Sequence, residues 1–298
     1  EIAAPTAEAL SAAERAAAEA STVLVAPPVQ FTVTADYDGK TVEVAKFDDY
    51  VERMIAIPDG VDRDRITTGV VIDPDGTVRH VPTQVVNVDG TYYARINSLT
   101  NSTYAVVWHP VEFADMANHW AEKNVNDMGS RMVVDGDGDG TFGPDRSITR
   151  AEFAAVMVRA LGLGPERGEG SFSDVTGSER FADAVHAAAA YGLVTGFEDG
   201  SFRPDERITR EQAMVILAKA MALTNLREKL SARPPEEALA TFRDVADVSG
   251  WALAGIADSV EAGLVTGVGG ERLAPKAALT RVEAAVLASR LLSNAGLI

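Results

Sequence analysis

The chain has 298 residues, with 27 Lys and Arg against 44 Asp and Glu, which gives a formal net charge of −17 at pH 7. This acidity argues against a nucleic-acid-binding protein, because neutralising phosphates requires a basic surface. The absence of cysteine excludes a disulfide framework, a thiolate nucleophile and a cysteine-ligated metal. No apolar run approaches the roughly 18 residues needed to span a membrane, so we expect no membrane insertion.

The N-terminal third of the chain changes character near residue 27. Residues 1–27 are rich in alanine and have high helix propensity but no broad apolar face, so we expect a helical leader or linker. From residue 28 to 110, short alternating runs are separated by turn dipeptides such as Asp38-Gly39 and Asp89-Gly90. This pattern predicts a β-sandwich-like domain without a catalytic constellation, which we interpret as a spacer.

Three internal repeats follow, at residues 111–165, 170–224 and 240–298. In each, a Thr is followed three positions later by Glu or Gln, ahead of an apolar run. This is the pattern of a capping box, so it predicts the start of a helix in every repeat. The pairs are Thr149 and Glu152, Thr209 and Gln212, and Thr280 and Glu283. With an earlier helix, each repeat is a helix–turn–helix unit that must pack against the others to bury its apolar face.

An arginine follows each capping threonine, at Arg150, Arg210 and Arg281. The first position of a helix disfavours a cation, because the helix dipole is positive there. The threefold placement therefore suggests a use: beside free backbone N–H groups, each arginine would form a receptor for a carboxylate or phosphate. A salt bridge to the aspartate of a repeated Phe-x-Asp motif is the alternative, and the residues alone leave both interpretations open.

Residues 113–292 resemble three consecutive S-layer homology domains. The first repeat reads Phe-Ala-Asp-Met-Ala-Asn-His-Trp-Ala from residue 113, then Asp-Gly-Thr-Phe-Gly-Pro, then Ile-Thr-Arg-Ala-Glu-Phe. The β-rich segment is similar, more weakly, to a module that often precedes such domains. The resemblance implies an α+β multidomain chain in which a mainly α, pseudo-threefold trimer of repeats forms a three-pronged spindle around a central three-helix bundle.

The resemblance also implies a function, which is non-covalent anchoring of an exported protein to the bacterial cell wall. Such domains bind a secondary cell-wall polysaccharide in grooves between the repeats, typically one with a pyruvyl ketal on N-acetylmannosamine. Its carboxylate would meet the arginines, while aspartates would bind sugar hydroxyls, aromatic rings would pack on a sugar, and glycines would let backbone amides approach. The residues implied are Asp115, Trp120, Gly136, Arg150, Asp174, Phe181, Gly196, Arg210, Asp244, Trp251, Gly267 and Arg281. Phe181 departs from the Trp of the other repeats, so we expect the grooves to differ in affinity.

Three further interpretations compete with polysaccharide binding. Asp135, Asp137 and Asp139 resemble the opening of a calcium loop, but Arg146 stands at position twelve, where a bidentate Glu is needed. No zinc, Walker or nucleophile-elbow motif is present, so we expect no enzyme and no cofactor. The third is a structural module of a surface lattice without glycan binding of its own. We expect a monomeric fragment, with lattice contacts to other surface proteins as an additional partnership.

Overall fold

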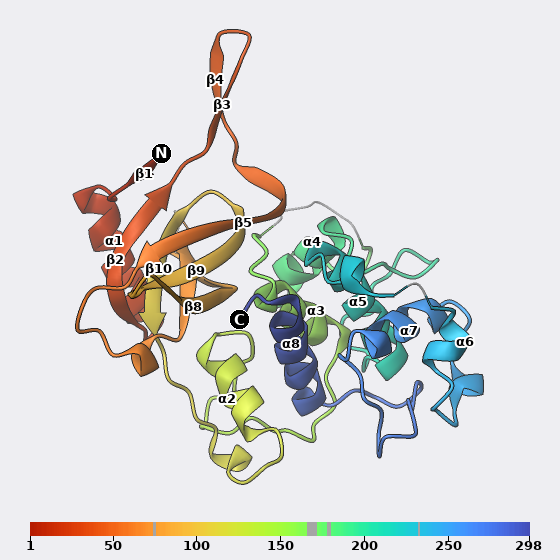
Figure 1. Cartoon of the computed structure of the whole chain (residues 1–298). Coiled ribbons are helices and arrows are strands. Elements are labelled where there is room, and N and C mark those ends of the chain that lie inside the picture. Colours follow the sequence, from red (N-terminus) through yellow and green to blue (C-terminus); the bar gives the residue numbers. More distant parts are fainter. Residues whose placement is uncertain (74–75, 166–171, 178–179, 232) are drawn as a thin grey trace.

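The computed structural model describes residues 1–73, 76–165, 172–177, 180–231 and 233–298. A β-rich part is followed by a helical part, as predicted (Figure 1). The expected start of the second repeat, at residue 170, lies outside the described residues. No helix in the described ranges is long and apolar enough to cross a membrane.

Two antiparallel sheets face each other in the β-rich part. The first contains, in pairing order, β1 (Ile2–Ala3), β2 (Val23–Phe31), β10 (Thr103–Trp108), β6 (Thr68–Ile72) and β7 (Val78–Val81). The second contains β5 (Lys46–Ala56), β9 (Thr91–Thr100) and β8 (Thr83–Val88). Their shared core includes Val71, Ile96 and Tyr104, none of which is exposed to solvent. The hairpin of β3 (Thr34–Tyr37) and β4 (Lys40–Glu43) projects away from both sheets (Figure 1).

Residues 1–27 belong to this β-rich domain, which corrects the expectation of a leader or linker. Helix α1 (Ala7–Glu19) packs Ala13 and Ala16 against Val70 and Val107 on the outer face of the first sheet. Strand β2 also crosses the predicted boundary at residue 27. The expectation failed because alanine side chains are small: a narrow alanine stripe lets a helix approach a sheet closely without the broad apolar face that sequence analysis seeks.

Among the described residues, each repeat contributes two main helices to the helical part. They are α2 (Glu122–Ser130) and α3 (Arg150–Ala160), α4 (Ala182–Ala190) and α5 (Arg210–Leu223), and α7 (Leu253–Glu261) and α8 (Arg281–Ala295). A short helix α6 (Pro235–Ala238) precedes the third repeat, and single 3-10 turns occur at 114–116, 227–229 and 245–247, with a further one at 63–65 in the β-rich domain. All three predicted capping boxes are confirmed, because each Thr side chain accepts from the backbone of the residue three positions on, and that residue's side chain accepts in return.

The repeats exchange their helices. The first helix of each repeat packs on the second helix of the repeat before it: α4 on α3, α7 on α5, and α2 on α8. The backbone follows the same cycle. Ile148 N donates to Leu279 O at 3.0 Å, Leu279 N to Ile208 O at 2.9 Å, and Ile208 N to Ile148 O at 3.1 Å. Each repeat therefore depends on both others, as expected for units too small to form separate cores.

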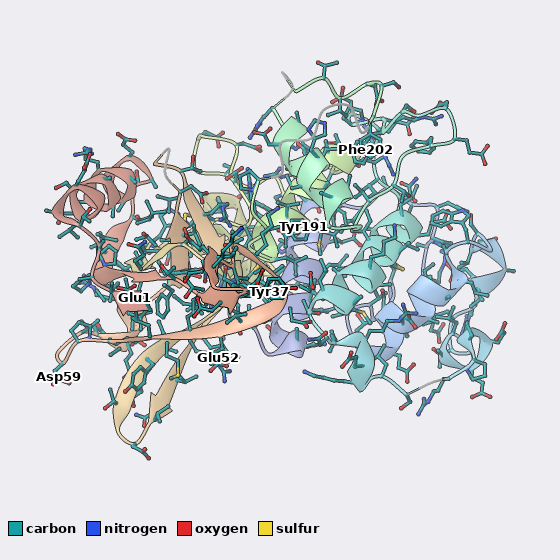
Figure 2. All side chains as sticks on the ribbon, turned by 90° about the horizontal axis from the view of Figure 1, so that it is seen from above. Glu1, Tyr37, Glu52, Asp59, Tyr191 and Phe202 are labelled. Atoms are coloured by element: carbon teal, nitrogen blue, oxygen red, sulfur yellow. The ribbon has the colours of Figure 1, made fainter. Side chains whose placement is uncertain are left out.

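The β-rich domain is packed against the repeats, although the sequence suggested a spacer. The Tyr50 hydroxyl donates to Leu161 O at 2.7 Å, and Arg79 Nη1 donates to Gly162 O at 3.0 Å. Seen from above, Tyr191 lies where the two parts meet (Figure 2). Burial and the nearby Tyr191 raise the pKa of the Tyr50 hydroxyl, so it remains a neutral hydrogen-bond donor. The domain thus has fixed contacts with the end of the first repeat.

Candidate functional site

Three pockets with a common plan lie between the repeats. Each combines the turn glycine of one repeat, the helix-start arginine of the repeat before it, and an aromatic residue of the repeat after it. The first pocket contains Gly136, Arg281 and Phe181; the second contains Gly196, Arg150 and Trp251; the third contains Gly267, Arg210 and Trp120. Their volumes are about 410, 650 and 430 Å³. Every pocket therefore needs all three repeats, which the cyclic packing of the helices provides.

Each arginine is held in place by a backbone carbonyl of the following repeat. Arg150 Nε donates to Phe202 O at 2.9 Å, and its guanidinium lies 4.7 Å from the centre of the Phe202 ring. The other two donate to Leu273 O at 2.9 Å and Phe142 O at 2.8 Å. Arg150 is only 7% exposed, and burial lowers the pKa of its guanidinium. Each arginine thus presents a positioned, partly desolvated cation, whose bond to an anion is stronger than in open water.

The helix starts do not offer the free backbone N–H groups that we expected. Arg150 N donates to Glu206 O at 2.8 Å, and Ala151 N donates to Pro204 O at 3.0 Å. Glu152 N donates to the Thr149 hydroxyl. The same three kinds of bond recur at the other two helix starts. The positive charge of each pocket therefore comes from side chains, because the helix N-terminus is already occupied by protein groups.

The three aspartates of the Phe-x-Asp motifs lie outside the pocket linings. Each accepts two consecutive backbone N–H groups, one on each carboxylate oxygen. Asp174 accepts from Phe202 and Arg203, both at 2.7 Å, while Asp115 and Asp244 accept at 2.8 Å from the equivalent residues of their own repeats. Burial would raise the pKa of Asp174, but these N–H groups outweigh it and hold the pKa below its usual value.

The aspartates thus stabilise the turn whose backbone carbonyl accepts the hydrogen bond from the arginine Nε. Within the described residues, no ion pair joins an aspartate of this motif to Arg150, Arg210 or Arg281. The salt-bridge alternative is therefore wrong for the described pairs. The predicted contact with sugar hydroxyls also has little geometric support, because both oxygens of each carboxylate already accept hydrogen bonds.

The turn glycines are required by the packing behind the pocket. A Cβ on Gly196 would lie 2.7 Å from the Phe172 ring and 2.8 Å from Ser201 O. A Cβ on Gly136 or Gly267 would meet the phenylalanine of its own Phe-x-Asp motif in the same way. Of these three turn glycines, only Gly267 has a left-handed backbone, with φ of +77°. Close packing against an aromatic ring, which the sequence analysis did not consider, therefore explains these glycines without a ligand.

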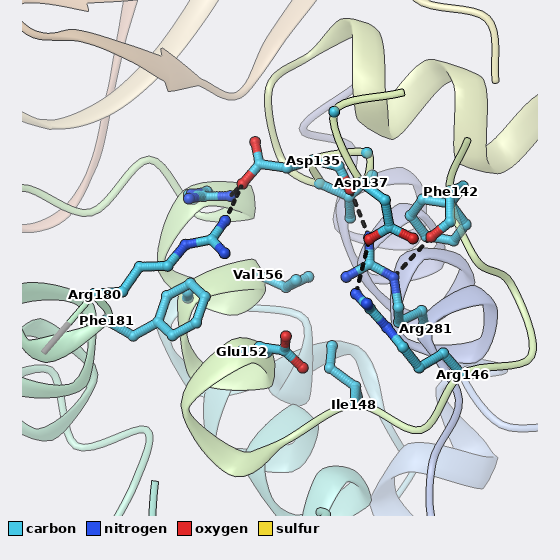
Figure 3. Close-up of a pocket in the computed structure, with 15 residues that line it drawn as sticks. Asp135, Asp137, Phe142, Arg146, Ile148, Glu152, Val156, Arg180, Phe181 and Arg281 are labelled. Carbon is cyan, nitrogen blue, oxygen red and sulfur yellow. Dashed lines mark hydrogen bonds and ion pairs between the residues drawn. The ribbon is translucent and has the colours of Figure 1, made fainter. Parts of the chain in front are cut away.

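The aromatic residues of the three pockets differ in their exposure to solvent. Trp120 is 68% exposed and Trp251 is 60% exposed, so each offers a flat apolar face to solvent. Phe181 is partly buried, and the Arg180 guanidinium lies 4.9 Å from the centre of its ring. Figure 3 shows Arg180 and Phe181 together on one side of the first pocket, opposite Arg281 and Arg146. The first pocket therefore has its aromatic face partly occupied by a protein cation.

The aspartates of the calcium-like loop are engaged by protein groups. Asp135 pairs with Arg159 at 2.7 Å, and Asp137 pairs with Arg146 at 3.0 Å (Figure 3). Asp139 accepts from the backbone and hydroxyl of Thr141. In the described part of the chain, no cluster of three or more acidic or histidine side chains is arranged to hold a metal ion. The carboxylates bind cations and donors of the protein, and they do not converge on a common point.

A second cation in each pocket escaped the sequence analysis. It lies on the second helix of each repeat, which we call the pocket helix, nine residues after the arginine that starts that helix. The three residues are Arg159, Lys219 and Arg290. The register of the repeats could have revealed it. Because helix exchange puts Arg159 of the first repeat beside Arg281 of the third, sequence alone does not say which pairs of cations share a pocket.

The family model of the S-layer homology domain matches residues 112–154, 171–214 and 241–285. The chain is 34% identical over 202 residues to an amylopullulanase of Thermoanaerobacterium thermosulfurigenes, which is 67% of this chain and 10% of that relative. It is 32% identical over 178 residues to the surface-layer 125 kDa protein of Lysinibacillus sphaericus, covering 59% and 14%. It is 33% identical over 172 residues to the S-layer protein EA1 of Bacillus anthracis, covering 57% and 18%.

These matches show three S-layer homology domains, as the sequence suggested, and they place the chain at the bacterial cell surface or cell wall. The chain spans less than a fifth of the length of each of these relatives. Both enzymes and surface-layer proteins are among them, so what they share with this chain is the surface-anchoring region.

Proposed function

We propose that the three S-layer homology domains of this chain anchor a surface protein by binding an anionic polysaccharide of the cell wall in the three pockets. The observation that carries the proposal is the repeated pairing of a positioned arginine with an aromatic residue from a different repeat. An acidic sugar presents a carboxylate and an apolar ring face, and these are the two features that each pocket can receive.

A pyruvyl ketal on N-acetylmannosamine meets this requirement. Its carboxylate can accept hydrogen bonds from the guanidinium and from the cation on the pocket helix. Its ring can pack on the indole of Trp120 or Trp251, both of which are exposed. The −17 charge of the chain does not prevent this, because binding depends on the local cations and exposed charges are screened beyond about 8–10 Å.

The pocket plan is consistent with a pseudo-threefold arrangement of the repeats. The cyclic backbone bonds through Ile148, Ile208 and Leu279 support it, as does the exchange of helices in one direction around the cycle. In this arrangement α3, α5 and α8 form the central bundle, and the exchanged first helices form the outer prongs. We assign no catalytic step to the chain, and its role is to bind.

Co-sedimentation with purified wall polysaccharide tests the proposal. Binding should be strong to the native polymer and should fall at least tenfold after mild acid removes the ketal, because each arginine then loses its anionic partner. Equal binding to both polymers would contradict the carboxylate mechanism. No binding to either would favour the alternative of an assembly module without glycan binding.

A further inference from the structure

The three pockets differ in how far the protein itself neutralises their cations. In the third pocket, Arg210 Nη1 forms an ion pair with Glu283, the capping residue of α8, and Arg290 Nη1 donates to Leu264 O at 3.1 Å. Glu283 thus acts as an internal carboxylate where a ligand carboxylate would bind. A ligand must displace Glu283 or share the guanidinium with it, and either reduces the gain in free energy on binding.

The first pocket is occupied by protein groups in another way. Arg281 Nη2 donates to Asp135 O at 2.6 Å, in addition to the Nε bond made by all three arginines. The side chain of Asp135 pairs with Arg159. The aromatic face of Phe181 is partly occupied by the Arg180 guanidinium, 4.9 Å from the ring centre (Figure 3). Four arginines line this pocket, but Arg146 and Arg159 are paired with aspartates, and the aromatic ring is less exposed than in the other two pockets.

In the second pocket, the capping residue beside the arginine is neutral. Its capping residue is Gln212, where the other two pockets have Glu152 and Glu283. Gln212 Oε1 accepts from Thr209 N at 3.0 Å, so the side-chain NH2 group remains available as a donor. Substituting an amide for a carboxylate removes one negative charge beside Arg150 while preserving the capping box.

The cations of the second pocket are correspondingly free. Among the described residues, neither Arg150 nor Lys219 forms an ion pair. Glu206 attracts Arg150 through space, but its carboxylate lies 3.7 Å from Arg203 Nη1. Asp199 accepts from Arg203 Nη2 at 3.1 Å, and Asp174, which also attracts Arg150 through space, accepts two backbone N–H groups. Glu198 is a further acidic residue in the lining of this pocket. Arg203 thus offsets Glu206 and Asp199, and in the described part of the chain no carboxylate forms an ion pair with Arg150 or Lys219.

The geometry points to the second pocket as the principal site for the acidic sugar, with Gln212 as the residue that selects it. Arg150, Lys219 and the Gln212 amide bind the carboxylate, and the exposed indole of Trp251 packs on the ring. This pocket is also the largest of the three, at about 650 Å³. The inference rests on the proposed function, because it assumes that the ligand is an acidic sugar.

Exchanging the capping residues tests the inference without removing an arginine. The probe is N-acetylmannosamine bearing a pyruvyl ketal, with its neutral methyl ester as the control ligand, and affinity is measured by isothermal titration calorimetry on the full chain. Gln212→Glu should weaken binding of the acid about tenfold or more, because the new carboxylate can pair with Arg150 as Glu283 pairs with Arg210. Glu283→Gln should strengthen binding in the third pocket and raise the stoichiometry toward two.

The results distinguish a failure of the inference about Gln212 from a failure of the proposed function. Each substitution introduces a residue that already completes the capping box in another repeat, so the helix cap and the fold should persist, and thermal melting checks this. An unchanged affinity in Gln212→Glu would overturn the role of Gln212 and of the second pocket. A wild-type chain that binds neither the acid nor the wall polymer, or that binds the methyl ester equally, would instead contradict the proposed function. Lys40→Ala, in the projecting hairpin, controls for general charge effects.

Discussion

Arg150 and Asp174 hold the two sides of the same residue, Phe202. Arg150 Nε donates to the Phe202 carbonyl at 2.9 Å, and Asp174 Oδ1 accepts from the Phe202 amide at 2.7 Å. The arginine comes from the first repeat and the aspartate from the second. A cation of the pocket is therefore oriented by a turn that an aspartate outside the pocket stabilises. This relationship explains why both residue types recur in every repeat although they do not form a salt bridge.

Replacing Asp174 with Asn should destabilise the second repeat and weaken its pocket. Asn retains one good acceptor oxygen, so one of the two backbone N–H groups loses its partner, at a cost of about 1–2 kcal/mol. Urea denaturation measures the loss of unfolding free energy, and the exposed Asp59→Asn is the matched control. Unchanged stability together with weaker sugar binding would show instead that Asp174 contacts the ligand.

Replacing Gly196 with Ala should cost about 1–3 kcal/mol of unfolding free energy, because the new methyl group would overpack against the Phe172 ring and Ser201 O. Gly250→Ala is the control, since its Cβ would meet no atom within 4 Å and its φ is not positive. Chemical denaturation of both variants checks the difference. Equal stabilities would mean that the turn can move away from the ring at little cost, and that the glycine serves the ligand after all.

The stability of the protein should decrease below about pH 6.5 because of His80. Burial, reinforced by Arg131 and Arg79, lowers the pKa of His80 well below its usual value. The unfolded chain therefore takes up a proton as the pH falls through about 6.5 while the folded protein does not, and unfolding becomes easier by up to about 1.4 kcal/mol per pH unit. Urea titrations between pH 8 and pH 5 measure this slope, which His80→Gln should remove and His119→Gln should retain.

Replacing Tyr50 with Phe should weaken the contact between the β-rich domain and the repeats. The hydroxyl donates to Leu161 O, and its removal leaves that carbonyl without this partner, at a cost of about 1–2 kcal/mol. Tyr37→Phe is the control, because Tyr37 is 83% exposed in the projecting hairpin. If the domains unfold together, both fluorescence and circular dichroism should report the same shift. Two separate transitions would contradict a fixed interface.

The sequence predicted the features that depend on neighbours along the chain. The three capping boxes are confirmed because a cap needs only a Thr and a Glu or Gln three residues apart. The β-rich region was also visible, because alternation and Asp-Gly turns are local signals. Helix α1 was missed as a packed element, since its contact with the sheet depends on small alanine side chains meeting a surface formed far along the chain.

The sequence by itself determined the three repeats, the start of each second helix and the residue types from which the pockets are made. Only the tertiary structure decided which of them meet, because the first helix of each repeat packs on its neighbour and each pocket draws on three repeats. It also separated the aspartates, which stabilise turns, from the arginines, which line the pockets. The physical reason is that capping is a matter of spacing along one helix, whereas pairing and neutralisation of charges depend on distances between segments that only folding brings together.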